Sequence, residues 1–138
     1  MKLFGMMLLL LLSTAATAWP QQDGFIDDSD VKVVSFKPVG YPAMARLKHE
    51  GGAVVVKVTL DDNGKVVKAA PISGTKDLID LCVDNVKSWE FRPNSEKSAV
   101  IVYLFQTEDG ICPGGDLRFS YIRPNLAKVS WCPAPPTE

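Results

Sequence analysis

The segment YPAMARLKHEGGAVVVKVTLDDNG, residues 41–64, sets out in one run the elements around which this 138-residue chain is built. Pro42 suits the first turn of a helix, because the N–H that proline lacks has no intrahelical acceptor there. Residues 43–48 continue for one or two helical turns. Gly51-Gly52 ends this helix, since glycine readily adopts the left-handed conformation found at helix C-termini. The segment therefore predicts a short helix, then a strand and a tight turn.

The strand that follows the glycines alternates in polarity. Alternate residues of a strand share one face, and the apolar face is formed by Val54, Val56, Val58 and Leu60. Lys57 and Thr59 lie on the other face, which is half exposed. Asp62-Asn63-Gly64 supplies the turn, because Asn and Gly tolerate positive φ. In the returning strand, residues 65–72, Pro71 indicates an edge or a bulge, where no ladder donor is needed.

From Asp77 the apolar spacing becomes that of a helix. One stripe contains Leu78, Leu81, Cys82, Val86 and Trp89, while Asp80, Asp84 and Lys87 face water. Arg92-Pro93 forces an exit, since the residue before proline is pushed out of the helical region. The next strand, residues 99–105, is apolar on both faces. It is either central in its sheet or covered on its second face by a later part of the chain.

Several separated motifs in this region suggest a family. They are Tyr41-Pro42 before the first helix, Gly52 before the valine strand, Asp61-x-x-Gly64 in the hairpin, Ser73-Gly74 before the second helix, and Trp89-x-Phe91-x-Pro93 after it. Their order resembles that of the C-terminal domain of TonB-family energy transducers. The resemblance implies an α+β domain over residues 31–105, with a small antiparallel sheet and two helices on one face. The residue pattern itself also predicts a short strand at residues 31–36, ended by Pro38 and Gly40, with an edge position as one option.

The resemblance also implies a mode of binding. In this family the open edge of the last strand pairs with an N-terminal segment of an outer-membrane transporter, and main-chain hydrogen bonds supply the affinity. The corresponding residues here are Val100, Ile101, Val102, Tyr103, Leu104 and Phe105. A strand from residues 106–138 would close this edge if it paired there, so this alternative stays open. The family also allows a homodimer by strand exchange.

The N-terminus has the features of a secretory signal. Lys2 precedes an apolar run over residues 3–12, and Ala16-Thr17-Ala18 has the form of a cleavage site. We expect cleavage after Ala18, export to the periplasm of a Gram-negative cell and no membrane span afterwards. The alternative is an uncleaved anchor in the inner membrane, although a spanning helix needs about 20 apolar residues. Residues 19–30 are expected to form a flexible acidic lead.

This N-terminus bears on function. A full transducer has an anchor and a long spacer, whereas a lead of about 20 residues, at about 3.3 to 3.6 Å per residue, could not cross a periplasm. The favoured function is therefore a non-catalytic periplasmic interaction domain that binds a transporter or another envelope protein by strand addition. One alternative is a component of TonB-dependent transmembrane transport, with a retained anchor or an anchored partner. Another is a small secreted hydrolase or inhibitor.

The cysteines of an exported chain suggest a disulfide. Cys112 and Cys132 lie in Pro-rich surroundings of the C-terminal extension, residues 106–138, and are the favoured pair. Such a bridge would stabilise the fold by roughly 3 kcal/mol in the chain-entropy model. Cys82 lies on the apolar stripe of a helix and is expected to be buried. Within the extension, residues 117–122 and 127–132 are predicted to form a hairpin, followed by a frayed tail.

No catalytic, metal or cofactor site is predicted. His49 is the single histidine and sits beside a glycine turn, where an exposed loop role is expected. The cysteines lack the paired spacing of a zinc site. The formal charge is −1, and it becomes −2 without residues 1–18, which carry one lysine and no acidic residue. Basic residues are scattered, so nucleic acid is not expected as a partner.

Overall fold

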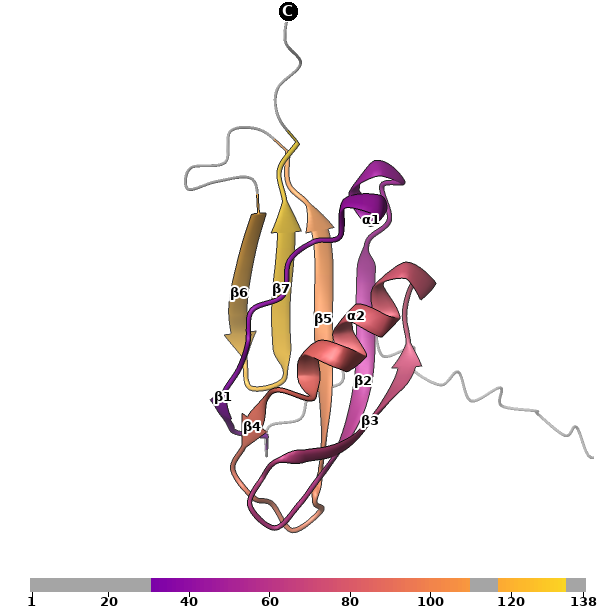
Figure 1. The fold of residues 1–138 in the computed structure, drawn as a ribbon. Helices are drawn as coiled ribbons and strands as arrows, with labels where there is room; N and C mark the ends of the chain where they lie inside the picture. Colours follow the sequence, from indigo (N-terminus) through magenta and orange to yellow (C-terminus); the bar gives the residue numbers. More distant parts are fainter. Residues whose placement is uncertain (1–30, 110–116, 134–138) are drawn as a thin grey trace, which may run out of the picture.

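The computed structural model describes residues 31–109 and 117–133, which contain one main sheet (Figure 1). Its strands lie in the spatial order β3 (Val66–Ser73), β2 (Gly52–Leu60), β5 (Ser98–Thr107), β7 (Leu126–Trp131) and β6 (Leu117–Arg123). Neighbouring strands are antiparallel except β5 and β7, which are parallel. The predicted α+β class is confirmed, but the sheet is mixed and not purely antiparallel. The parallel pair arises because the chain passes to β6 first and returns between β5 and β6.

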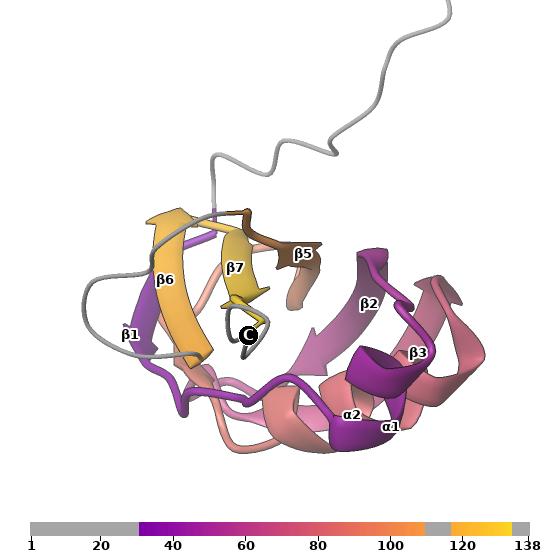
Figure 2. The same cartoon turned by 90° about the horizontal axis from the view of Figure 1, so that it is seen from above.

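Two helices lie on the same face of this sheet, as predicted (Figure 2). They are α1 (Ala43–Leu47) and α2 (Lys76–Val86), and α2 packs on β2 and β3. The stripe on α2 places Leu78, Cys82 and Val86 fully inside. Helical spacing of apolar side chains therefore identified the buried face of this helix.

A short strand precedes the helices but does not join the main sheet. β1 (Val33–Ser35) pairs with β4 (Glu90–Phe91) in a separate two-stranded sheet. The expected strand at residues 31–36 is thus shorter, and it lies in this small sheet and not in the main one. Residues 36–41, called the crossing segment below, lead from β1 across the face of β6 and β7 to α1 (Figure 1). This face of the extension is covered by an extended chain and not by a helix.

The core lies between the sheet and these covering elements. β2 contributes the four residues that the alternation predicted, all at most 2% exposed, and β5 contributes the alternate residues Ala99, Ile101, Tyr103 and Phe105. Trp89, which follows α2, is 1% exposed and closes the core at that end. The extension adds two fully packed side chains from β7, Ala127 and Val129.

The turn between β2 and β3 depends on a glycine. Gly64 has a φ of +81°, and a Cβ there would lie 1.8 Å from the carbonyl oxygen of Phe91. The same glycine's carbonyl accepts a hydrogen bond from the Phe91 N–H, at 2.9 Å. Asp61 completes the turn, since its Oδ1 accepts from the N–H groups of Asn63 and Lys65. The sequence-based turn prediction is confirmed.

Some expectations concern residues that the structure does not describe. The signal segment at 1–18, the acidic lead at 19–30, Cys112 and the tail at 134–138 all lie outside the described residues. Across residues 31–109 and 117–133, no helix has the length and apolar character needed to cross a membrane.

Candidate interaction edges

The strand expected to offer an open edge is paired on both sides. β5 pairs with β2 along Ser98–Phe105 and with β7 along Val102–Thr107. The prediction that residues 100–105 form a free edge was therefore wrong, because the C-terminal extension supplies a strand at that position. The structure instead has the other arrangement considered above, in which β5 is a central strand and the chain's own extension pairs with it.

β7 is held firmly in this position. Ala127 and Val129 are at most 1% exposed, and Leu126 and Ser130 are at most 9% exposed. Burying a side chain of Val or Leu size contributes about 1.5–3 kcal/mol. Releasing β7 would expose these side chains and break its ladder to β5, at a cost of several kcal/mol. A partner strand therefore cannot replace β7 at low cost.

The direction of the main-chain groups can be followed across the sheet. The N–H of Val102 donates to Asn125 O and that of Glu108 to Trp131 O, both at 2.8 Å. Main-chain groups alternate in direction along a strand, so those of residue 125 and of residues 127, 129 and 131 in β7 point to β5. Residues 126, 128 and 130 then face β6. The same alternation continues in β2. The N–H of Leu60 donates to Lys97 O on the side of β5, and the N–H of Asp61 donates to Lys65 O on the side of β3.

This alternation defines the outer edge of β6. Arg118 pairs with Ser130 and Ser120 pairs with Lys128, so the main-chain groups of Arg118 and Ser120 point inward to β7. Those of Leu117, Phe119 and Tyr121 point outward. Within the described ranges no strand pairs with this outer side. β6 therefore presents main-chain donors and acceptors to a further strand.

The opposite edge, the outer side of β3, has a different character. Here Ala70 pairs with Lys57 and Lys68 pairs with Thr59, so the main-chain groups of Ala70 and Lys68 point inward to β2. The main-chain groups of Ala69 and Pro71 therefore point outward. Proline has no N–H, and the register shifts at both ends of the β2–β3 ladder. A proline and two irregularities are ways in which proteins prevent pairing at a sheet edge. β6 has one register shift, between Tyr121 and Arg123, and no proline.

An aromatic cluster covers β6 on the core side. The Phe36 ring of the crossing segment stacks on Phe119 and Tyr121, with ring centroids 5.4 and 5.3 Å apart, and lies 5.7 Å from Trp89. The Tyr121 hydroxyl donates to Pro124 O at 2.6 Å. Burial raises the pKa of Tyr121 above its usual value. These contacts hold the edge strand flat against the crossing segment.

A polar hub adjoins this cluster at Trp89. Asn85 Oδ1, on α2, accepts hydrogen bonds from Trp89 Nε1 at 2.9 Å and from the Tyr103 hydroxyl at 2.8 Å. Its Nδ2 donates to Lys37 O at 3.0 Å. One amide thus ties α2 to β5 and to the crossing segment. The spacing of Asn85 four residues before a buried tryptophan, whose N–H needs an acceptor, was the sequence signal for this hub, and it was missed.

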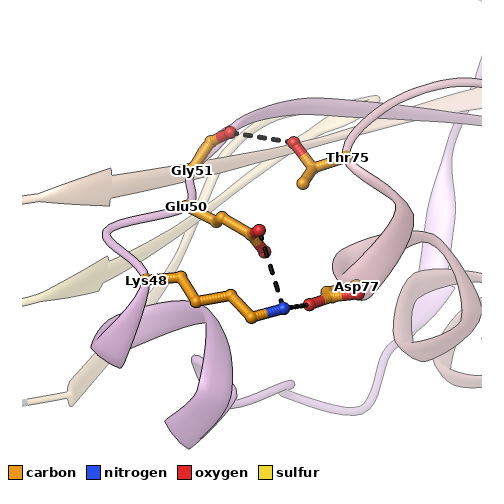
Figure 3. A network of polar contacts seen from close by, with 5 residues as sticks. All are labelled: Lys48, Glu50, Gly51, Thr75 and Asp77. Carbon is orange, nitrogen blue, oxygen red and sulfur yellow. Dashed lines mark hydrogen bonds and ion pairs between the residues drawn. The ribbon is translucent and has the colours of Figure 1, made fainter.

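A second polar network joins the two helices (Figure 3). Lys48 Nζ contacts the Asp77 carboxylate at the start of α2 and lies 3.9 Å from Glu50 Oε1. The Thr75 hydroxyl donates to Gly51 O at 3.2 Å, and the Tyr41 hydroxyl donates to Glu50 O at 2.5 Å. The Lys48 hydrogen bond and charge lower the pKa of Asp77. Because these groups form their hydrogen bonds and ion pairs with one another, we assign the network a structural role.

The reactive side chains do not form a catalytic set. Cys82 is free and fully buried, and burial raises the pKa of its thiol to about 12. His49 is exposed beside α1, with its ring 6.5 Å from that of Trp131. Among the described residues no group of three metal-ligating side chains occurs. Cys132 is 6% exposed at the end of β7, and its expected pairing with Cys112 stays a prediction.

Comparison with known proteins identifies the region that carries this fold. Residues 37–105 match the family described as the Gram-negative bacterial TonB protein C-terminal domain. The chain belongs to this family. Members of the TonB C-terminal family are periplasmic protein-interaction domains of the Gram-negative envelope, with a role in transport. No curated protein and no solved structure matches the chain.

The family match ends in β5, before the two strands that follow it in the sheet. It covers α1, β2, β3, α2, β4 and β5 as far as Phe105, and it stops before the two strands of the extension. β7 and β6 therefore lie outside the TonB C-terminal match but inside the same sheet. Because of the extension, the last described strand on this side of the sheet is β6 and not β5. Sequence periodicity predicted its hairpin, but not the strand beside which that hairpin lies.

Proposed function

We propose that this chain is a periplasmic TonB-like interaction domain that binds an extended segment of an envelope protein, such as an outer-membrane transporter, by β-strand addition. The observation that carries the proposal is the outer side of β6, where the main-chain groups of Leu117, Phe119 and Tyr121 point away from the sheet. Strand addition needs such a row of unpaired groups, which supplies affinity. Residues 100–105 then support the sheet from within and do not contact the partner.

Three further features belong to the proposal. The chain is exported through residues 1–18, acts without catalysis, and carries a Cys112–Cys132 bridge that ties the extension at the end of β7. Export would place these cysteines in an oxidising compartment. Purified periplasmic protein beginning at Trp19 supports cleavage, while protein in the inner-membrane fraction with an intact N-terminus supports the anchored alternative. A mass loss of about 2 Da relative to the reduced protein tests the bridge.

Site-directed photocrosslinking in cells tests the binding edge. The two positions compared are Ile122 on β6, 54% exposed, and Val67 on β3, 63% exposed. A photoreactive phenylalanine at Ile122 should capture a transporter segment, whereas the same residue at Val67 should not. Capture from Val67 alone would place the partner on β3 and overturn the assignment. Capture of a second copy from Ile122 would show a homodimer through the same edge.

A matched pair of substitutions then separates main-chain from side-chain contributions. Tyr121→Pro and Tyr121→Ala both remove the ring that stacks on Phe36, but Tyr121→Pro alone removes an outward N–H. The inward ladder is preserved in both, because the groups of Ser120 face β7. We expect Tyr121→Pro to bind the captured segment at least about tenfold more weakly than Tyr121→Ala. Equal binding by the two variants would contradict strand addition at β6.

A further inference from the structure

Between the crossing segment and the strands β6 and β7 lies a cavity of about 220 Å³. It is bounded by the crossing segment on one side and by the extension on the other, and its lining residues are Pro38, Val39, Gly40, Tyr41, Leu117, Arg118, Phe119 and Val129. Small-molecule sites are generally larger, at about 300–1,000 Å³. The cavity has room for a single side chain.

Resting on the proposed strand addition, we infer that this cavity is a specificity pocket that receives one apolar side chain of the docked segment. The register of the edge supports this placement. Residues directly opposite each other on neighbouring strands point their side chains to the same face, about 4.5–5.5 Å apart. A docked residue opposite Phe119 or Leu117 would therefore project its side chain to the face of the sheet that carries the Phe119 and Leu117 side chains, both of which line the cavity.

The chemistry of the lining selects an apolar guest. Leu117, Phe119 and Val129 present hydrocarbon, and the crossing segment contributes Pro38 and Val39. The one charged member, Arg118, lies 3.8 Å from the Glu108 carboxylate. A buried carboxylate from the partner would have to compete with Glu108 and lose its water, which is costly. An aliphatic side chain avoids both costs.

A second copy of the chain is a poorer occupant than a partner segment. In a β6-to-β6 pairing, each copy would offer the side chains of its own edge strand. Phe119 and Tyr121 are already stacked on Phe36, and the Tyr121 hydroxyl is bonded to Pro124 O. These rings would have to leave their own chain before filling the cavity of another. A separate extended segment with an unengaged apolar residue needs no such rearrangement.

Guest peptides test the pocket. The probes are eight-residue amidated peptides with Thr and Val in alternation and a central guest of Gly, Ala, Leu or Asp. Chemical shifts of the folded protein give each Kd, and loss of solvent exchange at the Phe119 and Tyr121 amides reports strand addition. We expect the Leu peptide to bind at least about tenfold more tightly than the Gly and Asp peptides.

Two substitutions change the cavity in opposite directions without touching the outward main-chain groups. Gly40 lines the cavity and a Cβ added there meets no atom within 4 Å, so Gly40→Leu adds an apolar side chain at the cavity wall without a backbone clash, with Gly40→Ala as the small control. Leu117→Ala enlarges it. Gly40→Leu should abolish the preference for Leu over Gly while the amides of Phe119 and Tyr121 still become protected. Leu117→Ala should shift the preference toward a Phe guest.

The outcomes separate the pocket from the edge. If all guests bind equally and protect these amides, or if Gly40→Leu retains the Leu preference, the pocket is overturned and strand addition stands. If no peptide protects the amides of Phe119 and Tyr121 in the unmodified protein, strand addition at β6 itself is overturned, and the pocket with it. Spectra of the free variants confirm that each one is folded before its binding is scored.

Discussion

The two flanks of the central strand β5 differ in what covers their strands and in how their outer edges are built. On one flank β2 and β3 are covered by α2, and the outer edge of β3 carries a proline and two register shifts. On the other flank β7 and β6 are covered by the extended crossing segment, and the outer edge of β6 is regular over Leu117–Tyr121. Within the described residues, the first flank therefore ends in an irregular strand that lacks an N–H at Pro71, whereas no strand pairs with the outer side of the second. Adding one hairpin beside β5 thus places a different strand, β6, at this end of the sheet.

The largest expected effect concerns the hub on the helix-covered flank. Asn85→Leu removes the acceptor shared by Trp89 Nε1 and the Tyr103 hydroxyl, two groups in side chains at most 1% exposed. Each unsatisfied buried donor costs about 1–3 kcal/mol, so we expect a loss of about 3 kcal/mol in the free energy of unfolding. Urea denaturation measures it. Asp84→Leu, at an exposed position of the same turn, is the control, and an equal loss there would show that the hub is not the cause.

The next effect compares one substitution on the two flanks. Val129→Ala on β7 removes two methyl groups from a side chain 1% exposed, and Val67→Ala on β3 removes them from one 63% exposed. We expect the first to cost about 2 kcal/mol and the second less than about 0.5 kcal/mol. Thermal unfolding of both variants gives the comparison. Similar values would mean that β7 is not an integral part of the core.

Amide hydrogen exchange sharpens the contrast within β6 itself. The N–H groups of Arg118 and Ser120 face β7, while those of Phe119 and Tyr121 face outward. In the free protein we expect the outward amides to exchange at least about tenfold faster than the inward ones. Two-dimensional NMR in deuterated solvent resolves the four signals. Uniform protection would indicate that another strand already covers this edge.

The smallest effect is expected at the closed edge. Pro71→Ala restores an N–H on β3, but this group points away from β2 and meets no acceptor there. The free energy of unfolding should change by less than about 0.5 kcal/mol. A restored donor should instead show as concentration-dependent association in analytical ultracentrifugation, since exposed edges invite pairing. A large loss of stability would mean that Pro71 does not face outward.

Local chemistry explains which parts of the fold were predictable from sequence. The turn at Gly64, the buried stripe of α2 and the alternation of β2 each follow from a short-range pattern that leaves few alternatives. The apolar character of both faces of β5 also indicated that this strand would be covered. The pattern of residues 126–131 predicted a strand, but alternation says nothing about which neighbour a strand selects.

The candidate site was less predictable for the same reason. The outward direction of the main-chain groups of Phe119 and Tyr121 follows from the hydrogen-bond ladders through β7, β5 and β2. It can therefore be assigned only when the pairing of all these strands is known. The cavity beside them needs the crossing segment, which lies about 80 residues earlier in the chain, to pack on β6. Such long-range contacts leave no periodic signal in the sequence.

The parallel placement of β7 has a consequence for the order of folding. β7 lies between β5 and β6 although it follows both in the chain, so β6 has no place in the sheet until β7 has arrived. The hairpin of β6 and β7, with a two-residue connection, can form locally first and then join β5 as a unit. Until residues 126–131 emerge during synthesis, the edge of β5 lacks its strand. A nascent chain halted before that point would expose the edge that the finished protein conceals, and would be the form most open to chaperones, proteases and misplaced strands.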